Sequence, residues 1–200
     1  AVSWTDVIQV VFLILGGLVT TYLALDTVSG GQGMWAGFEA IYAAAPDKFA
    51  MILDRSHPEY NNLPGIGVLV GGMWVANIYY WGFNQYIIQR TLAAKSLTEA
   101  QNGILFAAGL KLILPLIVVI PGIAAYVMVK DPAIMAGIGE AGQLNMPSTA
   151  QADKAYPWLL QFLPTGLKGL AFAALAAAIV SSLASMLNST STIFTKDIYK

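Results

Sequence analysis

Long apolar runs separated by polar, glycine- and proline-rich connections dominate this sequence. The longest runs predict four membrane-spanning helices, at about residues 4–25, 65–94, 97–128 and 166–197. Each run is long enough to cross a hydrocarbon core of roughly 30 Å at about 1.5 Å per residue. The stretches at about 26–64 and 129–164 are then the two outer connections. The pattern therefore predicts an all-α integral membrane protein.

Two of the predicted helices contain residues that disturb helical geometry. Pro115 and Pro121 fall inside 97–128, where each proline removes a backbone hydrogen bond and kinks the helix. Within 65–94 the apolar pattern weakens at Trp81-Gly82, which predicts an interruption or distortion at that point. The predicted bundle thus contains discontinuous helices.

Positive charge marks one side of the predicted membrane region. The short connections and the end of the last helix carry Arg90, Lys95, Lys196 and Lys200. By the positive-inside tendency this side is cytoplasmic, so the two long connections face outward. Ser96 and Glu99 form a capping-box pattern, which predicts that a helix begins there at a water interface.

The composition strengthens the membrane interpretation and excludes other classes. Hydrophobic residues make up 57% of the chain and charged residues only 10%, against about a quarter in soluble domains. A net charge of −1 offers no basic surface for nucleic acid, and the absence of cysteine excludes disulfides and thiolate metal sites. The sequence has no paired catalytic carboxylates, Ser/His/Asp set, metal motif or phosphate loop, so we do not expect an enzyme.

Polar and aromatic residues interrupt the second apolar run where lipid-facing helices carry leucine. The stretch reads Asn77-Ile-Tyr-Tyr-Trp-Gly-Phe-Asn-Gln-Tyr86. Counted from Gly65 at about 1.5 Å per residue, Asn77 lies roughly 18 Å into the membrane. Polar groups at that depth face protein or a water-filled cavity, which predicts a cavity lining. The alternative is that Tyr79–Trp81 belong to an interfacial aromatic belt.

Lys111 is the second residue at an unusual depth. It lies about fourteen residues into the third predicted helix, roughly 21 Å from Leu97. A lysine there costs about 2.5–3.5 kcal/mol unless it has a partner or a wet cavity. It is a candidate binding residue, and the alternative is pairing with a helix elsewhere in the protein.

The last predicted helix carries a small-residue and hydroxyl face. Ala178, Ser181 and Ser182 stand at i, i+3 and i+4, so one face offers a backbone carbonyl and two hydroxyls. Such hard oxygens suit an alkali cation, although serines in membrane helices also bond back to the preceding turn or join helices. Asp6, near the start of the first run, either favours the helix N-terminus or is a waypoint for a cation.

Several stretches together resemble a known family. They are Thr5–Gln9, Asn77–Ser96, Leu110–Pro115, Ile120–Gly122 and Ser181–Tyr199. In these residues the chain resembles the sodium/solute symporter family, in its sodium/glucose cotransporter branch, over essentially its whole length. The resemblance implies a fold of two inverted five-helix repeats, with sodium and substrate near the midplane at broken helices.

The resemblance also implies roles for residues. Asn77 and Lys111 would hydrogen-bond sugar hydroxyls, and Tyr80 would stack beneath the sugar ring as an inner gate. Trp81 and Asn84 would support that gate. The Ala178 carbonyl and the Ser181 and Ser182 hydroxyls would supply one half of a sodium site, with Asp6 along the ion's route inward.

The function expected from this resemblance is sodium-coupled symport of a neutral monosaccharide, galactose or glucose, by alternating access. Sodium, the sugar, the lipid bilayer and the remaining helices of the same protein are the expected partners. We expect an internal fragment of one transmembrane transporter domain, multi-pass in the cell inner membrane. The alternatives are a sodium-coupled symporter of an amino acid, a polyol or a vitamin, and a solute-binding channel or sensor.

Overall fold

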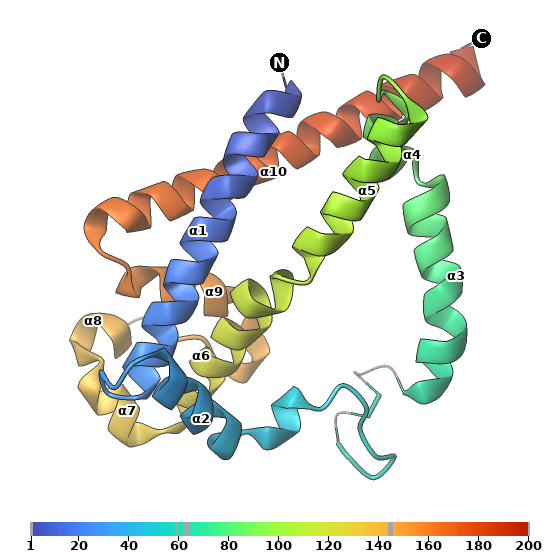
Figure 1. The fold of residues 1–200 in the computed structure, drawn as a ribbon. Helices are drawn as coiled ribbons and strands as arrows, with labels where there is room; N and C mark the ends of the chain where they lie inside the picture. Colours follow the sequence, from blue (N-terminus) through green and yellow to red (C-terminus); the bar gives the residue numbers. More distant parts are fainter. Residues whose placement is uncertain (1, 59, 62–64, 144–145, 200) are drawn as a thin grey trace. The chain divides into compact units, whose positions relative to one another are not determined.

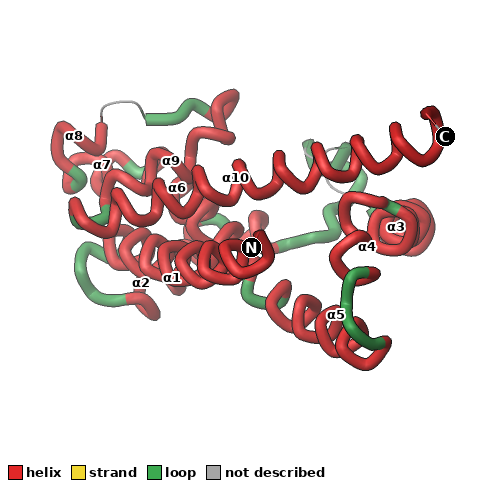
Figure 2. The backbone as a smooth tube through the Cα atoms, turned by 90° about the horizontal axis from the view of Figure 1, so that it is seen from above, coloured by secondary structure: helices red, strands yellow, loops and turns green. Residues whose placement is uncertain are grey.

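The computed structural model describes residues 2–58, 60–61, 65–143 and 146–199. Lys200, one of the predicted cytoplasmic charges, lies outside the described residues, as do parts of both predicted outer connections. The described residues form helices, turns and loops, with no strand among them (Figure 2). The chain divides into two units, one of 1–49 with 111–181 and one of 50–110 with 182–200, and each is described by itself.

Three helices in the described residues are long and apolar enough to cross a membrane. They are Trp4–Val28, Leu97–Lys130 and Thr165–Tyr199. The predicted span 65–94 is not among the three, and in the structure its helical run is interrupted at Asn84. An all-helical membrane protein, as the apolar pattern predicts, is therefore what the structure supports.

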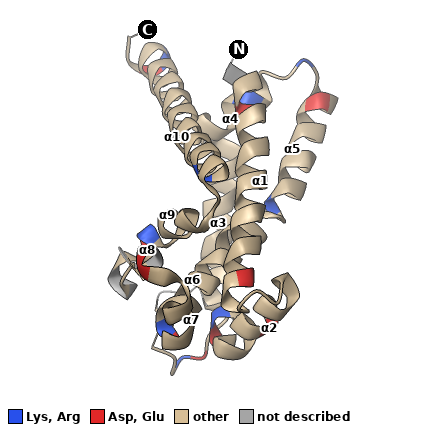
Figure 3. Ribbon diagram, turned by 90° about the vertical axis from the view of Figure 1, so that its left-hand side faces the viewer, with Lys and Arg blue, Asp and Glu red and all other residues tan. Residues whose placement is uncertain are grey.

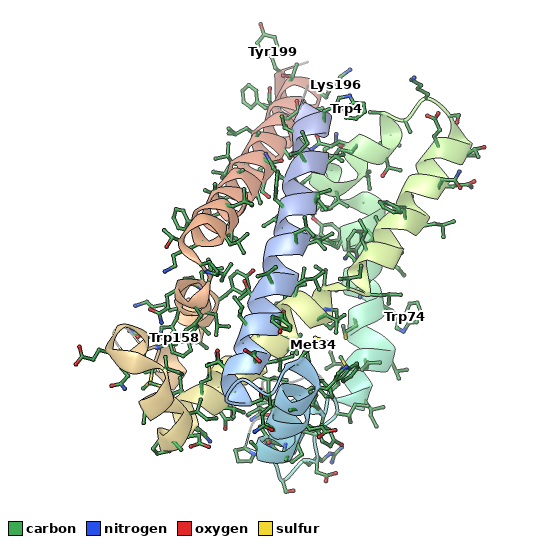
Figure 4. The ribbon with its side chains drawn as sticks, turned by 60° about the vertical axis from the view of Figure 1, so that its left-hand side comes forward. Trp4, Met34, Trp74, Trp158, Lys196 and Tyr199 are labelled. Atoms are coloured by element: carbon green, nitrogen blue, oxygen red, sulfur yellow. The ribbon has the colours of Figure 1, made fainter. Side chains whose placement is uncertain are left out.

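The first unit packs short helices and turns around one end of a long helix (Figure 1). Its elements are α1 (Val2–Val28), α2 (Met34–Ala44), a 3-10 turn (Pro46–Phe49), a π-helical segment (Pro115–Val119), α6 (Ile120–Lys130), α7 (Pro132–Gly137), α8 (Gly139–Gln143), a 3-10 segment (Thr149–Lys154), α9 (Ala155–Leu159), a 3-10 turn (Leu160–Phe162) and α10 (Thr165–Ile193) as far as Ser181. Its buried core includes Leu25, Ile41, Ala124, Met128 and Leu159. Trp158, labelled in Figure 4, sets its ring edge-on to Phe162, with 5.1 Å between centroids.

Glycines let the helices of this unit approach closely. A Cβ on Gly37 of α2 would lie 2.1 Å from the carbonyl oxygen of Leu25 on α1, so only glycine fits there. A Cβ on Gly17 would lie 2.8 Å from the Cβ of Ile117 in the π-helical segment. Close approach at these two glycines packs α1 against the α2 backbone on one side and against the Ile117 side chain of the π-helical segment on another.

In the π-helical segment the Leu116 carbonyl has no backbone N–H donor within its own helix, and a side chain of α1 donates to it instead. The Ile120 N–H bonds to the Pro115 carbonyl, five residues back. In the same register the Leu116 carbonyl would meet the nitrogen of Pro121, which has no hydrogen. The Thr21 hydroxyl lies 2.8 Å from the Leu116 carbonyl and 2.9 Å from the carbonyl of Gly17 on its own helix. Thr21 thereby satisfies this carbonyl and ties α1 to the π-helical segment.

The second unit contains the interrupted helix and the last part of α10. Its elements are a π-helical segment (Val68–Gly72), α3 (Met73–Ile78), a second π-helical segment (Tyr79–Phe83), α4 (Gln85–Leu92), α5 (Leu97–Lys111) as far as Leu110, α10 from Ser182 and a terminal π-helical segment (Phe194–Tyr199). The Ser96 hydroxyl accepts the Glu99 N–H at 3.2 Å, which confirms the Ser96 half of the predicted cap.

Large apolar side chains cover the outsides of the long helices. Only 11% of an 18-residue apolar stretch within Thr165–Tyr199 is buried. Trp4 on α1 is 77% exposed, and Trp74 on the shorter α3 is 66% exposed (Figure 4). Figure 3 shows few charged residues along α1 and α10. Apolar faces of this extent need lipid or further protein to cover them.

Candidate functional site

An acidic residue and a serine of the predicted ion site meet inside the first unit. The Ser181 hydroxyl on α10 donates a hydrogen bond to Asp6 Oδ1 on α1, and both residues are half-buried. Thr20 and Thr27 on α1 instead donate to carbonyls four residues back. Ser181 thus donates its hydroxyl proton to the carboxylate of Asp6 rather than to a backbone carbonyl of its own helix. The structure brings Asp6 and Ser181 into direct contact, a pairing that the sequence analysis did not predict.

Small residues set the distance between the two helices. A Cβ on Gly16 of α1 would lie 3.5 Å from the Cβ of Ala171, which is buried on α10. Asp6 lies ten residues before Gly16 on α1, Ser181 lies ten residues after Ala171 on α10, and these two side chains are also in contact. The two helices are therefore antiparallel in this unit, and they stay in contact over about 15 Å.

The predicted sodium ligands share one face of α10. Ala178, Ser181 and Ser182 are all half-buried at i, i+3 and i+4. In a regular helix the Ala178 carbonyl accepts the Ser182 N–H, and its second lone pair is left for another partner. No group of three or more His, Cys, Asp or Glu in the described part of the chain could hold a metal ion. This face of α10 offers hydroxyl and carbonyl oxygens, and the Asp6 carboxylate contacts it at Ser181.

The predicted sugar and gate residues of the second unit contact one another. Asn77 Nδ2 donates to the Met73 carbonyl at 2.8 Å, and Trp81 Nε1 donates to Asn77 Oδ1 at 3.2 Å. The rings of Tyr80 and Trp81 meet edge-on, with 5.0 Å between centroids. Tyr80 and Trp81 are 43% and 44% exposed. Trp81 therefore orients the Asn77 amide and borders the Tyr80 ring.

Asn84 is the residue at which the helix breaks. Its backbone is extended, with φ −77° and ψ 113°, and its side-chain oxygen accepts the Tyr86 N–H at 3.1 Å. The break predicted at Trp81-Gly82 thus lies inside the π-helical segment, and the chain leaves helical geometry two residues later. Asparagine is a strong N-cap residue, and an Asn just before a new helical run was the signal in the sequence.

Sequence reasoning also missed a polar network between α4 and α10 in the second unit. Gln89 and Arg90 bond to Ser185, and Asn188 bonds to Gln89. Ser185 and Ser189, one turn apart, are both buried. The signal available was the run of polar residues from Ser181 to Thr192, which spacing alone did not assign to a partner helix.

Lys111 ends α5 and is exposed. It is assigned to the first unit, whereas Asn77 and Tyr80 belong to the second. Neither unit contains all three of the predicted sugar-binding residues.

Tyr156 on α9, outside the membrane spans, lies half-buried beside α1. Burial raises the pKa of its hydroxyl, and a hydrogen bond with Thr20 opposes that rise. Val19 and Leu23 of α1 pack in the same cluster. The hydroxyl is therefore held in its neutral form at this contact.

Comparison with known proteins gives the family. The model of the Sodium:solute symporter family matches residues 1–200. The chain is 68% identical over 200 residues to a "Sodium/glucose cotransporter" of Vibrio parahaemolyticus, covering all of this chain and 37% of that protein. It is 36% identical to the human "Sodium/myo-inositol cotransporter 2", covering 31% of that protein, and 32% identical to the "Sodium/glucose cotransporter 4" of Danio rerio, covering 32%.

The chain thus spans about a third of the length of these curated relatives. The resemblance noted in the sequence is confirmed at the level of the family, whose members named here are transporters rather than enzymes. This chain belongs to the sodium:solute symporter family.

Proposed function

We propose that this chain is part of a carrier that takes up a neutral monosaccharide, galactose or glucose, together with sodium. The observation that carries the proposal is the 68% identity to a sodium/glucose cotransporter along the whole chain. In this proposal the rest of the protein supplies the other helices of a five-plus-five inverted repeat in the cell inner membrane.

In the proposed sodium site, sodium is a transported substrate and α10 supplies part of its coordination. The Ala178 carbonyl and the Ser181 and Ser182 hydroxyls bind the ion, and Asp6 lies on its route inward. The hydrogen bond from Ser181 to Asp6 supports this assignment, because it sets a negative charge beside the hydroxyl face. A carboxylate near an apolar span is costly when alone, and a bound cation offsets that cost.

In the proposed sugar site, Asn77 and Lys111 hydrogen-bond sugar hydroxyls while Tyr80 stacks against the apolar face of the ring. The bond from Trp81 holds the Asn77 amide in one orientation, which supports a fixed polar contact. The exposed ring of Tyr80 has room for a stacking partner. Trp81 and Asn84 support this gate, one at its edge and one at the helix break.

The proposed cycle is alternating access. Sodium favours an arrangement open to the outside with the sugar site formed, and sugar then favours closure and opening inward. Each ligand can shift this equilibrium only by its difference in affinity between the two states.

A cyclitol is the second candidate substrate. The 36% identity to a sodium/myo-inositol cotransporter supports it, since inositol is also a neutral polyhydroxylated ring. Competition of labelled galactose uptake by unlabelled glucose and myo-inositol separates the candidates.

The test is uptake of labelled galactose by the complete protein in proteoliposomes, with and without a sodium gradient. We expect accumulation against the sugar gradient that collapses with the sodium gradient, and strong loss in Tyr80→Ala and Lys111→Ala. Tyr79→Ala, which changes the neighbouring tyrosine, is the matched control. Uptake that equilibrates without accumulating would identify a channel, and sodium-driven uptake of another solute alone would change the substrate.

A further inference from the structure

Three hydrogen bonds join α4 to one face of α10 within the second unit. Arg90 Nη2 donates to Ser185 Oγ at 2.5 Å, and Gln89 Nε2 donates to the Ser185 carbonyl at 3.2 Å. Asn188 Nδ2 on the next turn of α10 donates to Gln89 Oε1 at 2.8 Å. Ser185 is only 7% exposed, so the central residue of the network is shielded from solvent.

This network continues the face of α10 that carries a proposed sodium ligand. Ser182, Ser185 and Ser189 stand at i, i+3 and i+7, so they line one side of the helix. One helical turn, about 5.4 Å, separates successive members of this row. A change in the position or orientation of α10 around Ser182 therefore reaches the Ser185 hydroxyl directly.

The other end of the network leads to the proposed gate. α4 is a short helix of eight residues, and its N-cap is Asn84. Asn84 directly follows the π-helical segment Tyr79–Phe83 that contains Tyr80, and its N–H bonds to the Tyr79 carbonyl at 3.1 Å. Arg90 lies six residues from Asn84, about 9 Å along the helix axis. A short capped helix thus connects Ser185 to the gate segment.

We propose that Ser185 is a positioning residue that, with Gln89, Arg90 and Asn188, couples sodium at Ser182 to the gate around Tyr80. This inference rests on the proposed function, because it assigns a route between the proposed sodium and sugar sites. A hydrogen bond with a charged donor is stronger and more directional than a neutral one, so the Arg90 bond transmits a shift of α10 rather than yielding to it. Sodium that holds α10 in one position thereby holds α4, and with it the gate.

The quantity that reports such a link is the factor by which sodium tightens sugar binding. Equilibrium binding of labelled galactose to the complete purified protein, without sodium and at saturating sodium, gives two dissociation constants and their ratio. We expect Ser185→Ala and Arg90→Gln each to lower this ratio about tenfold, within the usual range of coupling between two sites. The dissociation constant without sodium should change little, which a general loss of structure would not produce.

Two further variants and one double variant sharpen the test. Ser185→Thr keeps the hydroxyl and should keep the native ratio, whereas Ser191→Ala changes an exposed serine on α10 and should have no effect. Because Ser185 and Arg90 act through one bond, the double variant should resemble either single variant.

Each outcome separates the link from the proposed function. A native ratio above one that Ser185→Ala and Arg90→Gln leave unchanged would overturn the link while the symporter stands. Effects that add in the double variant would also overturn it. A native protein that binds galactose equally with and without sodium, or not at all, would overturn the link and the proposed function together.

Discussion

The hydrogen bond between Ser181 and Asp6 fixes how close the Asp6 carboxylate would lie to a sodium ion bound at Ser181, and this distance sets its contribution to sodium affinity. An ion on the Ser181 hydroxyl oxygen would lie about 5 Å from the Asp6 carboxylate charge, since the two side chains are in direct contact. Opposite unit charges at that separation attract by about 3 kcal/mol at an effective dielectric constant of about 20. This energy corresponds to roughly a hundredfold in affinity.

Asp6→Asn removes the charge and keeps the side-chain shape and an oxygen that accepts from Ser181. Because Asp6 is half-buried, solvent weakens the attraction, and we expect a rise of about tenfold to a hundredfold in half-saturating sodium. The assay is galactose uptake by the complete protein in proteoliposomes at increasing sodium, with maximal rates compared at saturation.

Asp47→Asn is the matched control, because Asp47 lies in an exposed turn, where it pairs with its neighbour Lys48 at 3.5 Å. It should leave the sodium dependence unchanged. A native sodium dependence in Asp6→Asn, alongside a shifted dependence in Ser182→Ala, would show that Asp6 adds nothing to ion binding.

Three further predictions concern the stability of the complete protein in detergent. Thr21→Val strips the Leu116 carbonyl of its donor and should cost about 1–3 kcal/mol, seen as a lower melting temperature; Thr27→Val, which loses only a bond within its own helix, should cost less. Asn84→Ala removes the cap of α4 and should cost about 1 kcal/mol, while Asn84→Ser should restore most of it; equal melting temperatures for both would contradict a capping role. Burial raises the pKa of Tyr156, so its contribution to stability is complete below about pH 10 and is lost as the pH rises further. Melting temperatures between pH 8 and 11 should fall less steeply in Tyr156→Phe, and identical slopes would refute this.

The apolar pattern was sufficient for the long helices, because lipid imposes a simple rule on length and polarity. The predicted runs at 4–25, 97–128 and 166–197 correspond to helical stretches whose ends differ from the prediction by a few residues. The polar stretch beginning at Asn77 also marked the interrupted helix. The predicted distortion at Trp81-Gly82 falls in the π-helical segment Tyr79–Phe83, whereas the helix ends at Asn84, whose capping ability the apolar pattern does not register.

Contacts between residues far apart in the sequence could not be predicted from the sequence pattern. Ser181 and Asp6 are 175 positions apart, and the choice of Ser181 between its own helix and a partner depends on how closely α1 and α10 approach. That approach is set by Gly16 and Ala171, which look unremarkable among many small residues. The Arg90 side chain was predicted only as a marker of orientation, whereas in the structure it bonds to Ser185.

The Thr21 hydroxyl that serves the Leu116 carbonyl makes two distant positions depend on one another. A hydroxyl is needed at position 21 because the residue at position 121 has no N–H to offer. A relative with an ordinary residue at 121 can satisfy the carbonyl within its own helix, and an apolar residue at 21 then carries no penalty. During the divergence of the family these two positions are therefore expected to change together, with proline at one accompanying threonine or serine at the other.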